Sequence, residues 1–244
     1  METTKFELPF AKKDQLTKDT YTFYFDRVKR GFAENFDYHA GQYFRVSLPI
    51  ENPDERGSSR YFTISSSPTD EFLTITTRII QSSFKMKLNS LKPGEKMTFF
   101  GPFGDMFQDE EDSTPKIFLA GGIGLNPSHS MLRFIDNKKL NVNFTLVVSF
   151  SLKEEVIFYE ELKEIEKRNP TVKIVYALTK EQNSYPGFET RRIDGNLIKK
   201  YAQDIVGSKF FISGPPVMVE AIENIVKEMG VEEKKIVAEN FTGY

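Results

Sequence analysis

The stretch "FLAGGIGLNP" (residues 118–127) decides the fold of the second half of this chain. An apolar segment runs into Gly121, Gly122 and Gly124, and Pro127 is placed to open a helix. Glycine lets backbone N–H groups approach an anion, and a helix N-terminus adds a favourable dipole. The pattern therefore indicates either a phosphate-bearing ligand or a tight strand-to-helix turn without one, because the spacing is not G-x-G-x-x-G.

The rest of the second half alternates between strands and helices. Strands are expected at 116–121, 143–150, 172–178, 209–213 and 235–239. Helices are expected at about 127–137, 157–168, 194–202 and 216–229. This alternation predicts a parallel α/β sheet, which binds ligands at the carboxyl ends of its strands. A second loop, "SGPP" (213–216), ends another strand, so we expect Ser213 to point into the same cleft.

The first half is rich in short strands. Aromatic and β-branched runs, separated by turn residues, predict strands at 20–28, 42–48, 60–66, 72–80 and 96–100. One segment, 82–91, has apolar residues at helical spacing instead. We therefore expect an antiparallel β-barrel followed by an α/β parallel-sheet nucleotide-binding domain. The polar stretch 108–115 is the expected linker, which places the domains at 1–110 and 111–244.

Composition excludes several kinds of site. The 244 residues are 39% hydrophobic and carry a net charge of −2, which gives no general attraction to nucleic acid. There is no cysteine, and His39 and His129 lie far apart, so we expect no metal site. No apolar run is long enough to span a membrane and no secretory signal is visible, so a cytoplasmic location is expected.

The stretch "RYFT" (60–63) is the other candidate for ligand binding. On a strand, Arg60 and Phe62 face one way, while Tyr61 and Thr63 face the other. A guanidinium and an aromatic ring on one face suit a ligand with a flat ring and a phosphate tail. An edge arginine beside a core phenylalanine is the alternative.

Four motifs together resemble the ferredoxin–NADP(+) reductase superfamily. They are "RYFTISS" (60–66), "LKPGEKMTFFGPFG" (91–104), "FLAGGIGLNP" (118–127) and "FISGPP" (211–216). The resemblance covers about residues 40–244. It implies a flavin-binding barrel with FAD, an NAD(P)H-binding domain that takes NADH or NADPH as hydride donor, and the activity of an NAD(P)H-dependent flavoprotein reductase.

The resemblance also implies roles for residues of the barrel. Arg60 would clamp the FAD pyrophosphate, and Phe62 would lie on the isoalloxazine, where the family usually has tyrosine. Thr63 would hydrogen-bond near flavin N5. The other cofactor-binding residues expected here are Tyr61, Ser82, Ser83, Phe84 and Lys85, with the helix amides near Ser82 and Ser83 offered to the FAD phosphates. Lys85 stands where many members carry serine or threonine; it either adds charge to the site or is a solvated helix lysine.

In the second domain, the resemblance places the nicotinamide cofactor on two loops. Their expected binding residues are Gly121, Gly122, Gly124, Asn126, Pro127, Gly214 and Pro215, with Asn126 in place of a common threonine. Ser213 stands where many members have a cysteine beside the nicotinamide, and it is expected to affect hydride transfer. Glu239 is a candidate proton source. Tyr244 is expected to stack on the isoalloxazine opposite Phe62.

Two questions stay open at the level of sequence. The electron acceptor would be a separate molecule such as ferredoxin or flavodoxin, and the alternative is a non-catalytic flavin- or nucleotide-binding module of a larger electron-transfer assembly. The choice between NADH and NADPH depends on whether a cation meets the ribose 2′-phosphate. The stretch 149–155, with Lys153, no arginine and two glutamates, favours NADH, whereas Lys180, Arg191 and Arg192 are the cations that could reverse this preference.

Overall fold

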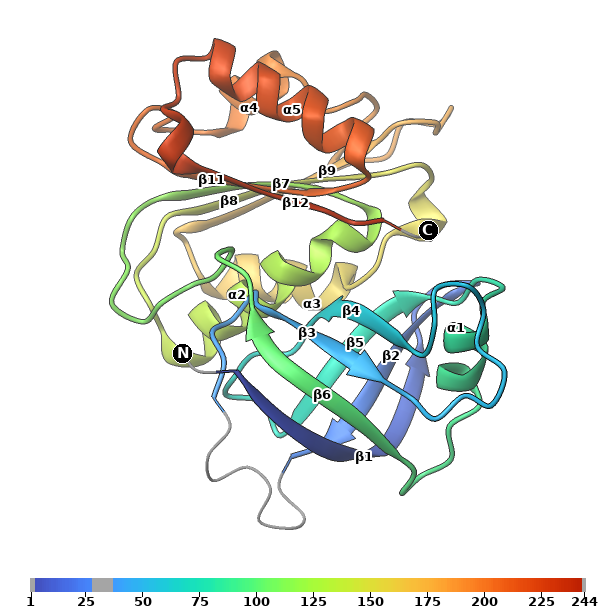
Figure 1. The fold of residues 1–244 in the computed structure, drawn as a ribbon. Coiled ribbons are helices and arrows are strands. Elements are labelled where there is room, and N and C mark those ends of the chain that lie inside the picture. Colours follow the sequence, from blue (N-terminus) through green and yellow to red (C-terminus); the bar gives the residue numbers. More distant parts are fainter. Residues whose placement is uncertain (1–2, 28–36, 243–244) are drawn as a thin grey trace.

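The computed structural model describes residues 3–27 and 37–242, which form two six-stranded sheets (Figure 1). The first sheet contains β1 (Thr4–Gln15), β2 (Thr20–Asp26), β3 (Tyr43–Ser47), β4 (Ser59–Thr63), β5 (Phe72–Arg78) and β6 (Lys96–Phe103). Its order is β4-β3-β6-β1-β2-β5, and all its pairings are antiparallel. A bridge between Ile64 and Ile75 joins the two outer strands, which confirms the predicted barrel.

Strand β1 has no counterpart among the predicted strands, although it is central to the barrel. It pairs with both β2 and β6. Only Leu8 and Phe10 of this strand are buried, and the charged residues further along it face solvent. The period-2 pattern that marks a half-buried strand is therefore too short to stand out.

Helix α1 (Ser83–Asn89) closes one end of the barrel, as the helical spacing within 82–91 predicted. Ser82 caps it by accepting a hydrogen bond from the N–H of Lys85. Phe84 and Leu88 point into the barrel core, where they join a set of fully buried phenylalanines that includes Phe23, Phe25, Phe44 and Phe99. Most of the abundant phenylalanine in the first half is therefore core packing.

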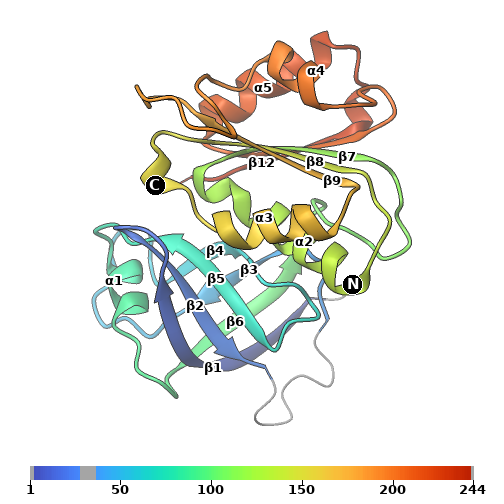
Figure 2. The same cartoon turned by 180° about the vertical axis from the view of Figure 1, so that it is seen from behind.

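The second sheet is parallel and has helices on both faces. Its strands are β7 (Lys116–Gly121), β8 (Phe144–Phe150), β9 (Val172–Leu178), β10 (Phe188–Glu189), β11 (Lys209–Gly214) and β12 (Ile236–Asn240), in the order β10-β9-β8-β7-β11-β12. Helices α2 (Asn126–Lys138) and α3 (Tyr159–Arg168) lie between this sheet and the barrel, whereas α4 (Gly195–Tyr201) and α5 (Pro216–Glu228) cover the outer face (Figure 2). The predicted α/β domain is confirmed, and the expected boundary at 110/111, which stays a prediction, falls between the two sheets.

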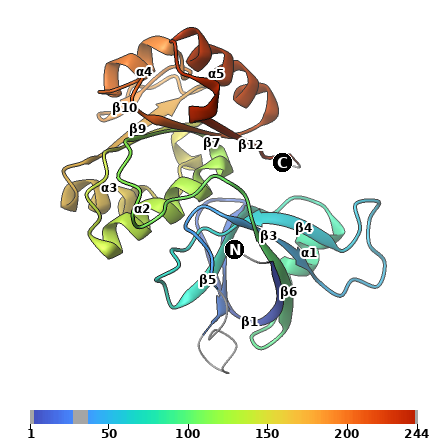
Figure 3. The same cartoon turned by 60° about the vertical axis from the view of Figure 1, so that its left-hand side comes forward.

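The order of strands reverses between β7 and β11. From β7 the chain builds outward through β8 and β9, and it then returns to place β11 on the other side of β7. In open α/β sheets a ligand crevice forms at such a switch point, at the carboxyl ends of the strands. The two glycine loops follow β7 and β11, which are neighbours in the sheet. Figure 3 shows α2, which follows the first of these loops, between the parallel sheet and the barrel. No helix in the described part of the chain is long and apolar enough to cross a membrane.

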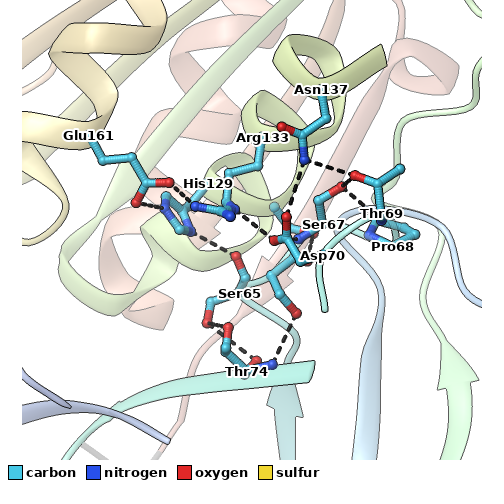
Figure 4. Close-up of polar contacts among 12 residues, drawn as sticks. Ser65, Ser67, Pro68, Thr69, Asp70, Thr74, His129, Arg133, Asn137 and Glu161 are labelled. Carbon is cyan, nitrogen blue, oxygen red and sulfur yellow. Dashed lines mark hydrogen bonds and ion pairs between the residues drawn. The ribbon is translucent and has the colours of Figure 1, made fainter. Parts of the chain in front are cut away.

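A polar network joins the two domains (Figure 4). His129 on α2 bonds through Nδ1 to the carbonyl oxygen of Ser65, 2.7 Å away, and through Nε2 to Glu161 Oε2, 3.0 Å away. Arg133, one turn further along α2, donates from Nε to Asp70 Oδ2 at 2.7 Å and also pairs with Glu161. One face of α2 is thereby bonded to the segment that follows β4.

Glu161 connects this network to α3. Burial opposes its ionisation, but His129 and Arg133 outweigh burial and lower the pKa of this carboxyl to about 2. The ionised form is therefore favoured in the folded protein.

We predict that Glu161→Gln destabilises the protein by about 1 kcal/mol near neutral pH, a figure discounted because the side chain is about one-third exposed. A carboxyl with a depressed pKa contributes stability above its unfolded pKa, near 4.5, and this is lost as pH falls toward 2. Urea unfolding between pH 5 and pH 2 should therefore show a shallower loss of stability in the variant. Equal slopes for variant and wild type would contradict the assignment.

Candidate functional site

A cavity of about 800 Å³, here called the barrel cavity, lies between β4 and the end of β12. Three aromatic side chains of the barrel, Tyr43, Tyr61 and Phe103, form its aromatic wall, and Phe241, which follows β12, also lines it. Tyr61 is 63% exposed, and its ring lies edge-on to that of Tyr43 at 5.8 Å between centroids. Such a wall offers flat apolar surface to a planar ligand.

Glu239 lies near the end of β12 in the wall of the barrel cavity, and its expected role as a proton source stays a prediction. A Cβ on Gly104 would lie 3.0 Å from Glu239 Oε1, so this glycine leaves room for the carboxyl. Burial, followed by the negative charge of Asp105, raises the pKa of Glu239 to about 7. This carboxyl can therefore hold or release a proton near neutral pH.

A smaller recess of about 90 Å³ adjoins the barrel cavity and is lined by several positively charged side chains. Arg56, Arg60, Arg78 and Lys85 all line it. Lys85 is only 9% exposed, and its burial together with the three arginines lowers its pKa to about 8. Lys85 is therefore not a solvated helix lysine. Four cations around one recess fit an anion such as a pyrophosphate.

Arg60 is held by the loop that precedes it. Its guanidinium donates to the carbonyl oxygens of Arg56, Gly57 and Ser59, and one nitrogen lies 2.9 Å from Asp54 Oδ1. The other oxygen of Asp54 accepts the N–H of Ser83 at 3.0 Å. The first amide of α1, which we expected to face a phosphate, thus already has a carboxylate partner, and the amide of Lys85 is bonded to the Ser82 cap.

The structure does not present the side chain of Phe84 to a cavity, and the expectation that this residue contacts a cofactor stays a prediction. Its side chain is fully buried in the barrel core, beneath the guanidinium of Arg60 at 5.3 Å and the ring of Phe62 at 5.9 Å. Helix α1 turns its apolar face inward, so Phe84 supports the two side chains above it. Phe62 itself is half-buried and lines the recess, and Thr63 lines both the recess and the barrel cavity.

A third hollow of about 600 Å³, the sheet-edge cavity, opens at the carboxyl ends of the parallel strands. Gly121, Gly122 and Pro215 of the two glycine loops line it. Gly122 has φ +54°, and a Cβ there would meet nothing within 4 Å, so this glycine leaves its backbone open to the cavity. A Cβ on Gly124 would instead collide with the carbonyl oxygen of Ser213. Gly122 thus fits the ligand explanation and Gly124 fits the packing explanation.

Ser213 does not point into the expected cleft. Its side chain is fully buried, and its hydroxyl donates to the carbonyl oxygen of Gly124. The neighbouring Gly214 packs closely against Gly121, since a Cβ added at Gly214 would lie 3.3 Å from Gly121 Cα. Ser213 therefore ties the two glycine loops together in this structure, and its expected effect on hydride transfer stays a prediction.

Asn126 has a buried polar atom without a hydrogen-bond partner among the described residues. The residue is 2% exposed, and Nδ2 donates to the carbonyl oxygen of Thr76 in the barrel, 2.7 Å away. Because that carbonyl can only accept, the amide orientation is fixed and Oδ1 is left buried with no partner among the described residues. Asn126 lines the recess, so a donor group of a bound cofactor fits there. Pro127 stands in the first turn of α2.

Two side chains belong to both halves of the site. Ile123 and Arg78 line the recess and also the sheet-edge cavity. The hollows that the barrel and the parallel sheet contribute are therefore adjacent.

Several lining residues were not predicted from the sequence. Arg56, Phe241 and Thr242 line both the barrel cavity and the recess, and the N–H of Phe241 donates to the carbonyl oxygen of Gly214 at 2.8 Å. Arg56 lies outside the motif around Arg60, so the motif did not predict it. It reaches the same recess because the chain turns at residues 54–57. Tyr244, the residue predicted to cover the flavin, lies outside the described residues.

Comparisons with known proteins agree with the division of the chain into a barrel and a parallel-sheet domain. The family described as "Oxidoreductase FAD-binding domain" matches residues 7–107, and "Oxidoreductase NAD-binding domain" matches residues 118–224. One subunit of the Na(+)-translocating NADH-quinone reductase of Klebsiella pneumoniae is 34% identical over 165 residues, which are 63% of this chain and 39% of that subunit. Flavohemoprotein A of Dictyostelium discoideum is 28% identical over 216 residues, covering 84% of this chain and 52% of that protein.

A solved structure shares the fold across both domains. It is a ferredoxin NADP+ reductase from Neisseria gonorrhoeae with bound FAD and NADP, with a TM-score of 0.79 at 20% identity over 97% of this chain and 98% of that one. The chain spans well under two-thirds of the length of the reductase subunits that it matches. Its two matched domains, joined in this order around one site, make the chain a member of the ferredoxin–NADP(+) reductase superfamily, an FAD- and NAD(P)H-binding oxidoreductase.

Proposed function

We propose that this chain passes hydride from NADH or NADPH to bound FAD and delivers the electrons to a separate carrier such as ferredoxin or flavodoxin. The observation that carries the proposal is the shared wall of Ile123 and Arg78, which puts the recess beside the sheet-edge cavity. FAD supplies a hydride acceptor that can return electrons singly. The chain contributes alignment of the two cofactors and exclusion of water.

The proposal assigns each part of the site a task. The cationic recess holds the FAD pyrophosphate through Arg60 and Lys85, and the aromatic wall of the barrel cavity accommodates the flat ring system. Gly122 and Pro215 receive the nicotinamide cofactor in the sheet-edge cavity. Asn126 accepts a hydrogen bond from an O–H or N–H group of the bound cofactor, since the pyrophosphate itself has only acceptor oxygens, and Glu239 holds an exchangeable proton in the barrel cavity.

A second candidate is a non-catalytic module of an electron-transfer assembly. The relatives that are subunits of NADH-quinone reductases favour membership of an assembly, while the adjacent cavities favour catalysis within it. Cytoplasmic location stays a prediction from the sequence.

The decisive experiment is an anaerobic titration of the yellow protein with NADH and with NADPH. Wild type should be bleached by at least one nucleotide. Gly122→Val should keep FAD but resist bleaching, since a branched side chain would fill the open space and disfavour positive φ. Gly94→Val, at an equally open glycine with φ +92° in a distant turn, controls for backbone strain and should bleach normally. A yellow wild type that neither nucleotide bleaches would reject catalysis.

Lys85→Met should lower FAD affinity about ten- to a hundredfold, the effect of losing one charge-assisted contact to phosphate. The melting temperature of the FAD-free variant should not fall, because a cation among three arginines is already disfavoured in the folded state. Lys87→Met on the same helix is the matched control, since Lys87 pairs with Glu95 at 3.0 Å outside the recess. Fluorescence titration with FAD and thermal melts distinguish the two effects. Unchanged FAD affinity in Lys85→Met would remove Lys85 from the site.

The rate of flavin reduction should fall as pH rises through about 7, because Glu239 holds its proton below that pH and loses it above. Glu239→Gln should abolish this dependence. Asp105→Asn should shift the midpoint downward, because it removes the negative charge that helps to raise the pKa. Stopped-flow measurements from pH 5.5 to 8.5 test both variants. A midpoint that persists in Glu239→Gln would assign the titration to another group.

A further inference from the structure

The sequence left four basic residues as candidates for binding the ribose 2′-phosphate that distinguishes NADPH from NADH. The structure shows that these four residues differ in whether they line the sheet-edge cavity. We propose that the sheet-edge cavity takes a nucleotide with a ribose 2′-phosphate, and that Arg192 binds this phosphate. The inference rests on the proposed function in one respect, namely that the nicotinamide cofactor occupies this cavity.

Three of the four candidates do not line the sheet-edge cavity. Lys153 Nζ lies over the ring of Tyr185, 4.2 Å from its centroid. Arg191 pairs with Asp194, three residues further along the chain. Neither side chain lines the sheet-edge cavity, and Lys180 does not line it either.

Arg192 is the candidate that lines the cavity. It is exposed, and no ion-pair partner for it is found within residues 3–27 and 37–242. The residues that follow fix its backbone: Ile193 is 8% exposed in the core under α4 and α5, and Asp194 caps α4 by accepting the N–H of Leu197 at 2.8 Å. An available guanidinium on an anchored segment is suited to bidentate binding of a phosphate.

The other charged residues of the cavity wall do not oppose an anion at Arg192. Glu155 is the one carboxylate among the lining residues, and it lies 4.0 Å from Arg78, which also lines the cavity. Arg78 also lies 3.2 Å from Asp19, so two carboxylates already compensate its charge, and Arg192 is the arginine of this wall that remains for an anion. Ser151 and Thr179, which follow the ends of β8 and β9, line the same cavity. The hydroxyl of Thr179 already donates to the carbonyl oxygen of Phe150 at 3.3 Å, so Ser151 is the one that adds a neutral donor. A 2′-phosphate, with up to two negative charges, would complement this wall better than a ribose hydroxyl.

The test uses two small probes on the FAD-loaded protein, adenosine 2′,5′-bisphosphate and 5′-AMP, which differ in the 2′-phosphate alone. Isothermal titration should show that wild type binds the bisphosphate at least about tenfold more tightly, the effect of one charge-assisted contact. Arg192→Ala should lose about ten- to a hundredfold in affinity for the bisphosphate and keep its affinity for 5′-AMP. Arg191→Ala, the adjacent arginine that is already paired, is the matched control and should keep the preference.

Three results would overturn the inference, and they differ from one another. Equal affinities of wild type for the two probes would show that the cavity does not recognise a 2′-phosphate. A preference that survives in Arg192→Ala but disappears in Lys180→Ala would move the contact to Lys180. Failure of both probes to bind wild type would reject the cavity as the nucleotide site, and the proposed function would fail with it. The ratio of kcat/KM for NADPH over NADH should follow the ratio of probe affinities in each variant.

Discussion

Direct backbone contact between the loops after β7 and β11 is the constraint on which the site depends. The hydroxyl of Ser213 bonds to the carbonyl of Gly124, and Gly214 lies against Gly121 with no side chain between them. This contact brings together the two loops on either side of the switch point, and it leaves Gly122 as the open backbone that faces the cavity. A larger residue at Gly124 would push the loops apart and widen the crevice that a nucleotide must fill.

The barrel contributes a cluster of positively charged side chains that nearby carboxylates compensate only in part. Arg56, Arg60, Arg78 and Lys85 surround a small recess, and Lys85 shows the cost of this arrangement in its lowered pKa. Asp54 compensates for part of that charge by bridging Arg60 and the first amide of α1. Asp19, which lies 3.2 Å from Arg78, compensates for another part. In the proposed function a bound pyrophosphate would add negative charge here and would thereby stabilise this end of the barrel.

The barrel and the parallel-sheet domain can form one site only if the two domains are held in a fixed arrangement. His129 and Arg133 of α2 bond to the segment after β4, and Asn126 at the start of the same helix bonds to β5. One helix therefore positions both the glycine loop at its N-terminus and the barrel surface beneath it. The wall shared through Ile123 and Arg78 follows from this docking, because both residues lie at the point where the helix meets the barrel.

The sequence by itself determined the barrel, the parallel sheet and the presence of two glycine loops, because these depend on hydrophobic periodicity and turn residues within short segments. It could not reveal β1, whose buried residues are too few to form a pattern, nor Arg56, which reaches the recess through a turn.

Tertiary structure alone decided which of several similar residues is open to a cavity and which is packed or paired. Gly122 is open while Gly124 is packed, Phe84 is buried beneath Arg60, and Arg192 lines a cavity while Arg191 is paired. Neighbours in sequence have nearly the same local preferences, and they differ in exposure and partners because those depend on segments far along the chain.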